Sequence, residues 1–237
     1  MVEAVKNVEA YLARKEKNSN AKADAPITNR YRTDTEATDE LWPVDYDYYQ
    51  LLIGILRWMV ELGRFNICVE VSMISSCLDI PREGHLQQLF HIFSYLKKHH
   101  NTEMVFDTSV PNFGADKFQL QDWSQTMYGD SPPDQPPNIP KPRGQGFIFS
   151  AHVDSDHAGD TVTRRSRTGL FIYFNNALFY GMSKKQGYID TSSFGSEFVS
   201  MRACTEYIRW LKFKLQIVCG GRAEETAPPA MSLISLS

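Results

Sequence analysis

The first hundred residues show helical periodicity. Between residues 45 and 100, apolar side chains recur at intervals of three and four, which predicts amphipathic helices. Three such stripes are present, at 49–60, 71–78 and 86–96. Gly63 is expected to end the first of these helices. A weaker stripe at 2–12 predicts a short N-terminal helix, which we expect to have little to pack against.

The period of the pattern changes beyond residue 146. Residues 147–154 alternate between the two faces of an extended chain, which predicts a strand. Two further strands at 168–174 and 177–182 are joined by Asn175–Asn176, a pair that favours a tight hairpin turn. A Thr-Ser-Ser cap signal then begins a long helix predicted over 194–218. Helices followed by a hairpin and a helix predict a mixed fold of the α+β or α/β class.

Changes in composition divide the chain into segments. Pro132–Pro133 and Pro136–Pro137 lie among polar residues, which is typical of a linker or a long insertion. A short strand is also expected at 104–107. We therefore expect a polar N-terminal segment with a short helix at 1–44, a helical region at 45–107, a Pro-rich linker or insertion at 108–146, the strands and long helix at 147–219, and a disordered tail at 220–237.

The composition is that of a soluble globular protein. Of the 237 residues, 42% are hydrophobic and 22% charged, which excludes a wholly disordered chain, a collagen-like repeat and a disulfide miniprotein. The formal net charge of -3 gives no support from overall charge for nucleic-acid binding. A basic face would have to be local.

Neither a secretory signal nor a membrane span is expected. The start at 1–4 lacks a basic and an apolar region, and the apolar stretch at 51–60 is well short of the about 20 residues that a span needs. The four cysteines form no C-x-x-C pair, so reduced thiols are favoured over a zinc site or a disulfide framework. The sequence thus predicts an intracellular protein, cytoplasmic or nuclear, that is not secreted.

One acid is unexpected on the long helix. The core-facing stripe predicted for this helix consists of Met201, Cys204, Ile208, Leu211 and Leu215. Glu197 stands one turn before that stripe, and a carboxylate there needs a partner, because burying an unpaired charge costs several kcal/mol. The alternative is a solvated first-turn acid that interacts favourably with the helix dipole.

A second group of acids follows the first predicted strand. Asp154 and Asp156 stand at its end, and Asp160 comes close behind. Carboxylates at a strand end that face a glutamate on a helix would form an oxygen-rich site suited to Mg²⁺. In phosphodiester hydrolysis, two such ions activate the water and stabilise the leaving oxygen. The alternative is an ordinary polar turn, since Asp-Ser-Asp and Ala-Gly-Asp are common turn sequences.

Positive charge gathers in residues 161–189, which contain no Asp or Glu. The cations of this stretch are Arg164, Arg165, Arg167, Lys184 and Lys185. Such a patch beside an acidic pocket would hold a phosphate backbone next to metal ions. The alternative is the solvated rim of a hairpin.

Several short blocks in this order resemble the C-terminal part of a copia-type retrotransposon polyprotein. The resemblance covers residues 1–219. The blocks are Tyr49–Trp58, Gly63–Ile67, His85 with Phe93–Lys97, Val153–Asp156, Arg164–Gly169, Ser183–Gln186 and Ser192–Phe198. Each block is short, and their order along the chain is what makes the resemblance specific.

The resemblance implies thumb or connection helices of a reverse transcriptase at 45–107, followed by a partial ribonuclease H-like domain at 147–219. Asp154 matches the catalytic aspartate of the family's first strand, and Glu197 matches its helix glutamate. Both would bind Mg²⁺ or Mn²⁺, and Asp156 is a second acid of the same block. Lys184 and Lys185 would contact the backbone of an RNA–DNA hybrid, as we infer from their charge.

The chain also departs from the family pattern. No Tyr-x-Asp-Asp block of the polymerase site is present, and the family's next strand, with another catalytic aspartate, does not follow the long helix. We therefore expect a truncated polyprotein fragment with little or no hybrid-cleaving activity alone, its partners being nucleic acid and the rest of the polyprotein, in a virus-like particle or the nucleus. The alternatives are a non-catalytic nucleic-acid-binding remnant and a transposon relic without function.

Overall fold

The computed structural model describes residues 1–15, 23–112 and 148–219. Most of the predicted linker and all of the predicted tail at 220–237 therefore lie outside the described residues. The chain divides into two compact units. Unit 1 consists of Met1–Met104, Ser155–Gly169 and Tyr180–Glu197, and unit 2 of Val105–Asp154, Leu170–Phe179 and Phe198–Ser237.

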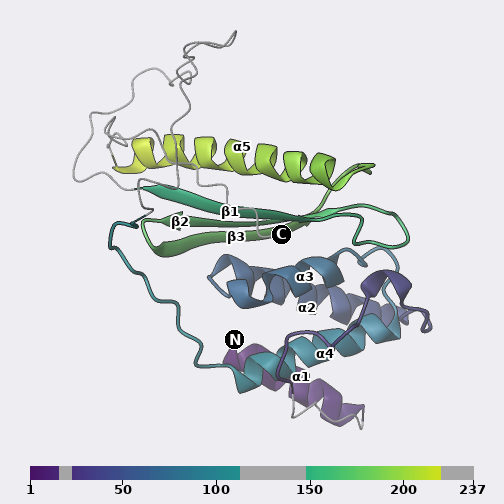
Figure 1. Cartoon of the computed structure of the whole chain (residues 1–237). Coiled ribbons are helices and arrows are strands. Elements are labelled where there is room, and N and C mark those ends of the chain that lie inside the picture. Colours follow the sequence, from purple (N-terminus) through teal and green to yellow (C-terminus); the bar gives the residue numbers. More distant parts are fainter. Residues whose placement is uncertain (16–22, 113–147, 220–237) are drawn as a thin grey trace, which may run out of the picture. The chain divides into compact units, whose positions relative to one another are not determined.

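The helices predicted for the first hundred residues are confirmed in unit 1 (Figure 1). They are α1 (Val2–Arg14), α2 (Pro43–Glu61), α3 (Cys68–Ser75) and α4 (Glu83–Lys98), with 3₁₀ turns at Thr33–Thr35 and Phe65–Ile67. Pro43 occupies the first helical position of α2, where its missing N–H costs no hydrogen bond. Gly63 has a φ of 103°, which an L side chain rarely adopts, and this explains why α2 stops there.

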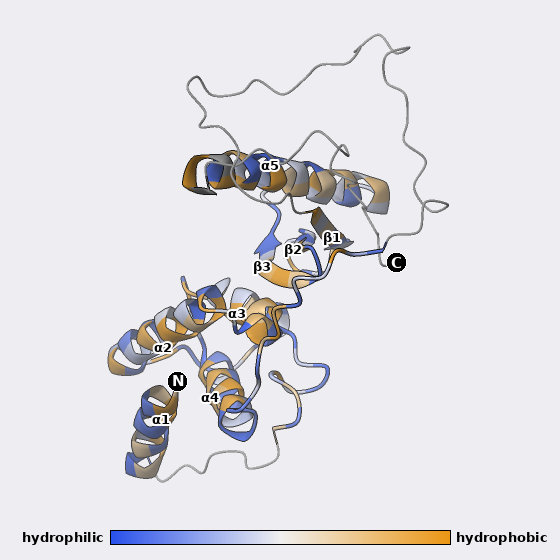
Figure 2. Ribbon diagram, turned by 90° about the vertical axis from the view of Figure 1, so that its left-hand side faces the viewer, coloured by the Kyte–Doolittle hydropathy of each residue, from blue (hydrophilic) through white to orange (hydrophobic). Residues whose placement is uncertain are grey.

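The apolar stripes of these helices meet in one hydrophobic core, and their hydrophobic residues are coloured orange in Figure 2. Its most deeply buried side chains include Tyr49, Leu56, Ile74, Leu89 and Phe93. The expectation that the N-terminal helix would have little to pack against is wrong. Val5, Val8 and Leu12 of α1 are buried in this core, and the Tyr11 ring stacks on Tyr48 with 4.0 Å between centroids.

His85 has a structural role at the start of α4. Its Nδ1 accepts a hydrogen bond of 3.0 Å from the backbone N–H of Arg82, so its Nε2 is left to donate to the Thr33 carbonyl at 3.0 Å. Burial lowers the pKa of this imidazole, which favours the neutral ring that these two bonds require. The bonds explain why a histidine is buried at this position.

The strands form an antiparallel sheet in the order β1-β2-β3, with β1 (Phe149–Asp156), β2 (Arg167–Phe174) and β3 (Ala177–Lys185). The predicted hairpin is confirmed: Asn175 turns the chain with a φ of 51°, and its side chain accepts a 2.9 Å hydrogen bond from the N–H of Ile148. The expectation of a short strand at 104–107 is wrong, because those residues form no regular structure. The described fold is thus α+β.

The last helix is α5 (Ser193–Cys219). Its predicted cap is confirmed, because Ser192 Oγ accepts a 3.1 Å hydrogen bond from the N–H of Gly195. In unit 2 the helix covers one face of the strands (Figure 1). Cys204, Ile208 and Leu211 of this part are buried. No helix of the described residues is long and apolar enough to cross a membrane.

The buried stripe of α5 differs from the prediction at its N-terminal end. Met201 is 38% exposed, whereas Ser196 and Ser200 are fully buried. The stripe therefore continues from Cys204 back through two serines rather than through Met201, and Glu197 is half-buried beside it rather than on it. Serine is small enough to be buried in a helix face once its hydroxyl is hydrogen-bonded, and Ser196 Oγ donates to the Ser193 carbonyl at 2.8 Å.

Candidate functional site

In unit 1, the end of β1 meets the first turn of α5. Ser155 Oγ donates a 2.8 Å hydrogen bond to Ser196 Oγ, which lies in that turn. The buried Gln186 completes the junction, since its amide Nε2 donates to the Ser196 carbonyl at 3.0 Å and to Thr168 Oγ1 at 3.1 Å. Ser196 and Gln186 thus fix the helix start against the strands, a role that the sequence reasoning did not assign to them.

The predicted acids occupy different surroundings. Asp154, in unit 2, is exposed at the end of that unit's part of β1, and Glu197 is half-buried in the first turn of α5. Successive side chains of a strand point to opposite faces, so Asp156 lies on the face of β1 opposite Ser155. That direction leads Asp156 into a cavity of unit 1 whose lining does not include Glu197.

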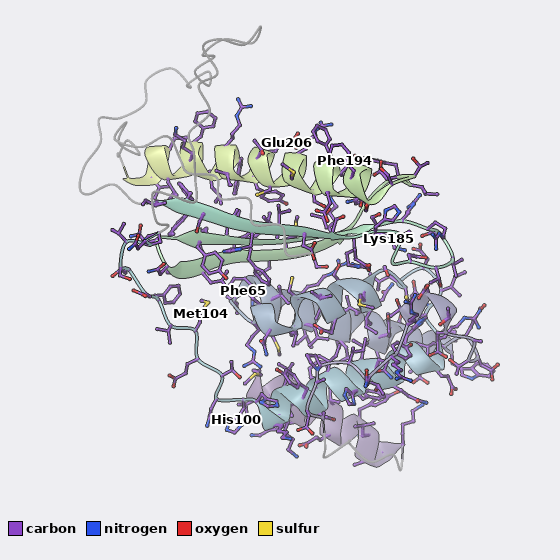
Figure 3. All side chains as sticks on the ribbon, viewed as in Figure 1. Phe65, His100, Met104, Lys185, Phe194 and Glu206 are labelled. Atoms are coloured by element: carbon purple, nitrogen blue, oxygen red, sulfur yellow. The ribbon has the colours of Figure 1, made fainter. Side chains whose placement is uncertain are left out.

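This mixed-charge cavity, of about 140 Å³, brings acids and cations together. Its charged lining residues are Asp34, Asp156, Asp160, Arg165, Arg167 and Lys185. Lys185 forms an ion pair with Asp160, and Figure 3 shows Lys185 at the end of β3. Burial alone would raise the pKa of Asp160, but hydrogen bonds from Lys185 and Thr163 outweigh it and bring the pKa to about 2. Asp160 is therefore ionised and already paired at neutral pH.

The loop that follows β1 is anchored in the same place. Asp34, in the 3₁₀ turn of unit 1, accepts hydrogen bonds from the Thr161 N–H at 2.7 Å and from the Thr161 hydroxyl. Ser166 is fully buried, and its Oγ accepts a 3.1 Å hydrogen bond from the N–H of Ala158. A Cβ at Gly159 would overlap the Asp156 carboxylate, which shows how closely that side chain packs on the loop. The loop geometry thus holds Asp156 in the mixed-charge cavity.

These surroundings do not provide a ready metal cage. Among the described residues, no group of three or more His, Cys, Asp or Glu side chains is close enough to hold a metal ion. Asp156 and Asp160 interact electrostatically with Arg167, and Asp160 is paired with Lys185. Since Mg²⁺ in proteins prefers several oxygen ligands, the described side chains do not fit it as they stand. The predicted roles of Asp154, Asp156 and Glu197 in metal binding stay predictions.

The five predicted cations fall into two groups. Arg164, Arg165 and Lys184 are exposed. Arg167 and Lys185 are engaged within unit 1, because Arg167 donates to Ser72 Oγ at 2.5 Å and Lys185 pairs with Asp160. Burial lowers the pKa of Arg167, while Asp156 and Asp160 oppose that shift. Within the described part of the chain, no salt bridge involves a residue of the first group.

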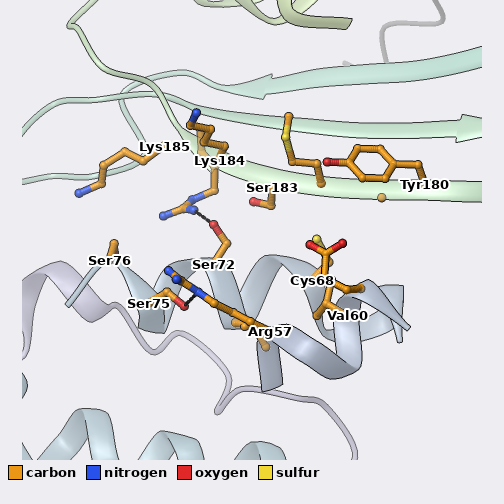
Figure 4. Close-up of a pocket in the computed structure, with 15 residues that line it drawn as sticks. Arg57, Val60, Cys68, Ser72, Ser75, Ser76, Tyr180, Ser183, Lys184 and Lys185 are labelled. Carbon is orange, nitrogen blue, oxygen red and sulfur yellow. Dashed lines mark hydrogen bonds between the residues drawn. The ribbon is translucent and has the colours of Figure 1, made fainter. Parts of the chain in front are cut away.

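A larger cleft of about 480 Å³ lies between α2, α3 and the unit 1 part of β3, and we call it the serine–arginine cleft (Figure 4). Its polar lining residues are Arg57, Glu61, Cys68, Ser72, Ser75, Ser76, Arg167, Tyr180, Ser183, Lys184 and Lys185. Arg57 Nε, from α2, donates to Ser75 Oγ at 3.1 Å, and Arg167, from β2, donates to Ser72 Oγ of the same helix α3.

Sequence reasoning missed this cleft. Arg57 seemed only to interrupt an apolar stretch. Ser72, Ser75 and Ser76 are spaced by three and four residues, which places three hydroxyls on one helix face, and that spacing is the signal that could have found them. The bond between Arg167 and Ser72 joins residues 95 positions apart, which no local pattern reveals.

Comparison of the chain with protein-family models, with curated proteins and with solved structures finds no match. No residue role is therefore transferred from a relative, and the function has to be argued from the geometry above and from the sequence resemblance.

Proposed function

We propose that this chain is part of a copia-type retrotransposon polyprotein, with thumb or connection helices followed by a partial ribonuclease H-like domain that contacts nucleic acid. The order of elements supports the proposal. Three antiparallel strands followed by a long helix come after a helical block, in the order that the sequence resemblance implies. The matching blocks also lie on defined elements: Tyr49–Trp58 lies within α2, and Val153–Asp156 ends β1.

The observation that carries the proposal is the junction of β1 with α5. Ser155 stands between Asp154 and Asp156, and its hydroxyl bonds to Ser196, which directly precedes Glu197. The two short blocks that carry the family's acids are thus linked by a hydrogen bond, although 41 positions separate the two serines. A resemblance in sequence alone would not require such a link.

The ancestral reaction of such a domain is metal-dependent hydrolysis of the RNA strand of an RNA–DNA hybrid. We expect this chain alone to cleave little or none. Mg²⁺ or Mn²⁺ would stabilise the leaving oxygen only if several oxygen ligands held it, and the described residues do not bring three candidate ligands together. The proposal for the chain as it stands is hybrid binding without turnover.

Binding is assigned to the exposed cations Arg164, Arg165 and Lys184. Each phosphate contact releases a counterion, so affinity falls steeply as salt increases. We expect the full chain to bind a labelled RNA–DNA hybrid in a fluorescence-anisotropy titration, with affinity dropping between low and physiological salt. Loss of Arg165 and Lys184 together (Arg165→Ala with Lys184→Ala) should weaken binding by about tenfold or more and flatten the salt dependence by about two phosphate contacts.

The matched control removes the same charge elsewhere. Lys6 and Arg14 are exposed on α1, and replacing both by alanine changes the net charge by the same amount. Equal weakening by the two double variants would contradict a local binding surface, because it would reflect net charge alone.

A cleavage assay tests the second half of the proposal. Wild-type chain is incubated with the hybrid and Mg²⁺ or Mn²⁺, beside Glu197→Gln. Robust cleavage by the wild type that Glu197→Gln abolishes would overturn the statement that the chain binds without turnover, and would place Glu197 in a working site.

A further inference from the structure

We propose that the serine–arginine cleft is a binding site for a phosphate group, built by Arg57, Arg167 and the hydroxyls of α3. The cleft lies wholly within unit 1, and none of the acids or exposed arginines discussed above is needed for it. The inference therefore does not rest on the proposed function, and a failure of hybrid binding would not contradict it.

Two guanidinium groups enter the cleft, each held by a serine. Arg57 uses its Nε for Ser75, and Arg167 uses one terminal nitrogen for Ser72. Neither arginine forms an ion pair within the described residues, so most of their N–H donors remain available. A guanidinium fork of this kind matches the oxygens of a phosphate, to which it can donate two parallel hydrogen bonds.

The serines add donors of their own. A serine oxygen that accepts from an arginine still has its own O–H to donate. The Ser75 and Ser72 hydroxyls are in this state, because each accepts from a guanidinium. Within the cleft the two arginines are held by serines rather than by carboxylates, although Asp156 and Asp160 act on the charge of Arg167 from the mixed-charge cavity.

Ser183 supplies an independent sign of a ligand. Its Oγ is buried and has no hydrogen-bond partner among the described residues. Figure 4 shows Ser183 on β3, pointing toward the α3 side of the cleft. A buried hydroxyl without a partner costs free energy unless something else satisfies it. An anion bound between Ser183 and the α3 serines would accept that hydrogen.

Charge and size define the ligand. The cleft is lined by Arg57, Arg167, Lys184 and Lys185 against the single carboxylate Glu61, although Lys185 is shared with Asp160. The lining thus favours an anion, and hydroxyl and guanidinium donors together favour oxygens over chloride. A volume of about 480 Å³ falls within the range of small-molecule sites, about 300–1,000 Å³, and admits a diphosphate or a mononucleotide.

The experiment uses the full chain and three probes: inorganic pyrophosphate, ADP and a short single-stranded oligonucleotide. Binding is measured by isothermal titration calorimetry. Arg57→Gln is the main variant, since Arg57 is exposed on α2 and its loss should leave the fold intact. Arg202→Gln is the control, because Arg202 is also an exposed helical arginine whose Nε donates to a neighbouring side chain, Glu206 Oε1, at 3.0 Å.

We expect at least one phosphate probe to bind the wild type, and Arg57→Gln to weaken it by about tenfold or more while Arg202→Gln has no effect. Binding of pyrophosphate or ADP assigns the phosphate to a small molecule, and binding of the oligonucleotide alone assigns it to a nucleic-acid backbone. Ser183→Ala should weaken the same probe severalfold, which separates a site from a general effect of charge. Absence of binding by all three probes, or binding that Arg57→Gln does not change, would overturn the proposal.

Discussion

The mixed-charge cavity and the serine–arginine cleft share Arg167 and Lys185 but differ in what faces these cations. In the first, Asp156 and Asp160 lie opposite them, and Lys185 is paired with Asp160. In the second, hydroxyls of α3 lie opposite, and Arg167 bonds to Ser72. A cation that faces a carboxylate forms an ion pair that stabilises the fold. A cation that faces a neutral hydroxyl is not neutralised by it, so its positive charge can still attract an anionic ligand. The same arginine thus takes part in both arrangements.

The difference also shows how acids and cations near each other in sequence are to be interpreted. Asp156, Asp160 and the cations that follow could have formed a metal site beside a phosphate-binding surface. In the structure they compensate one another in part. The charges that remain available are Arg57, on a different element, and the exposed Arg164, Arg165 and Lys184.

The largest expected effect comes from the compensated pair. Asp160→Asn removes the charge that pairs with Lys185 and weakens the hydrogen bonds from the N–H groups of Thr163, at 2.8 Å, and Val162, at 3.2 Å. Hydrogen bonds to charged groups contribute about 1.5–3 kcal/mol, so the free energy of unfolding should fall by about 2 kcal/mol. Urea denaturation followed by circular dichroism measures it.

An exposed pair provides the control for Asp160. Arg202 and Glu206 form an i,i+4 ion pair on α5 with both side chains mostly exposed. Glu206→Gln should change the free energy of unfolding by less than about 0.5 kcal/mol. If the two variants lose the same stability, the compensated cavity contributes no more than a surface pair does.

The stability that Asp160 supplies should also depend on pH. Its pKa is about 2 in the folded chain against an ordinary value of 3.8. A depressed carboxyl pKa gives stability that is fully present above pH 3.8 and is lost as the pH falls through about 2. The difference in unfolding free energy between wild type and Asp160→Asn should therefore be constant from pH 7 to 5 and shrink below pH 4. A difference that grows on acidification would contradict the ionised pair.

Much of the fold could be predicted because its helices carry their own signals. The stripe of α4 identified its buried face, and Gly63 marked the end of α2. The packing of α1 could not be predicted, since the helix packs on α4, and its Tyr11 on Tyr48, far along the chain. The α5 stripe failed at Met201 because a pattern of apolar residues does not register a buried serine such as Ser200.

The candidate site was predictable only as a set of residue types. The sequence identified the aspartates and the cations. It could not show whether Lys185 is available to a phosphate or paired with Asp160, because that depends on a contact across 25 positions. Likewise, nothing local indicates that Arg167 reaches Ser72 in α3. Pairing over such distances is set by how the elements pack, and it decides which charges remain available.

The bond that orients Arg167 should have a smaller effect than the Asp160 pair. Ser72→Ala removes the acceptor at 2.5 Å from the half-buried guanidinium, and we expect a loss of about 1 kcal/mol of unfolding free energy. Ser76→Ala is the matched control, because Ser76 is exposed on the same helix face and its Oγ donates to the Met73 carbonyl rather than accepting from a guanidinium. If Ser76→Ala lowers the free energy of unfolding as much as Ser72→Ala does, the hydroxyl–guanidinium bond contributes no more to stability than the bond of an exposed serine.

The smallest effect separates two adjacent lysines. Lys184 is exposed and its side chain forms no hydrogen bond or ion pair with the described residues, so Lys184→Ala should stay within about 0.5 kcal/mol of the wild-type unfolding free energy. Lys185→Ala removes the same charge from the same strand but leaves Asp160, whose side chain is 12% exposed, without its cation, and should cost clearly more. Equal losses would mean that the Asp160 pair is not formed in solution, and both lysines would then be available to a ligand.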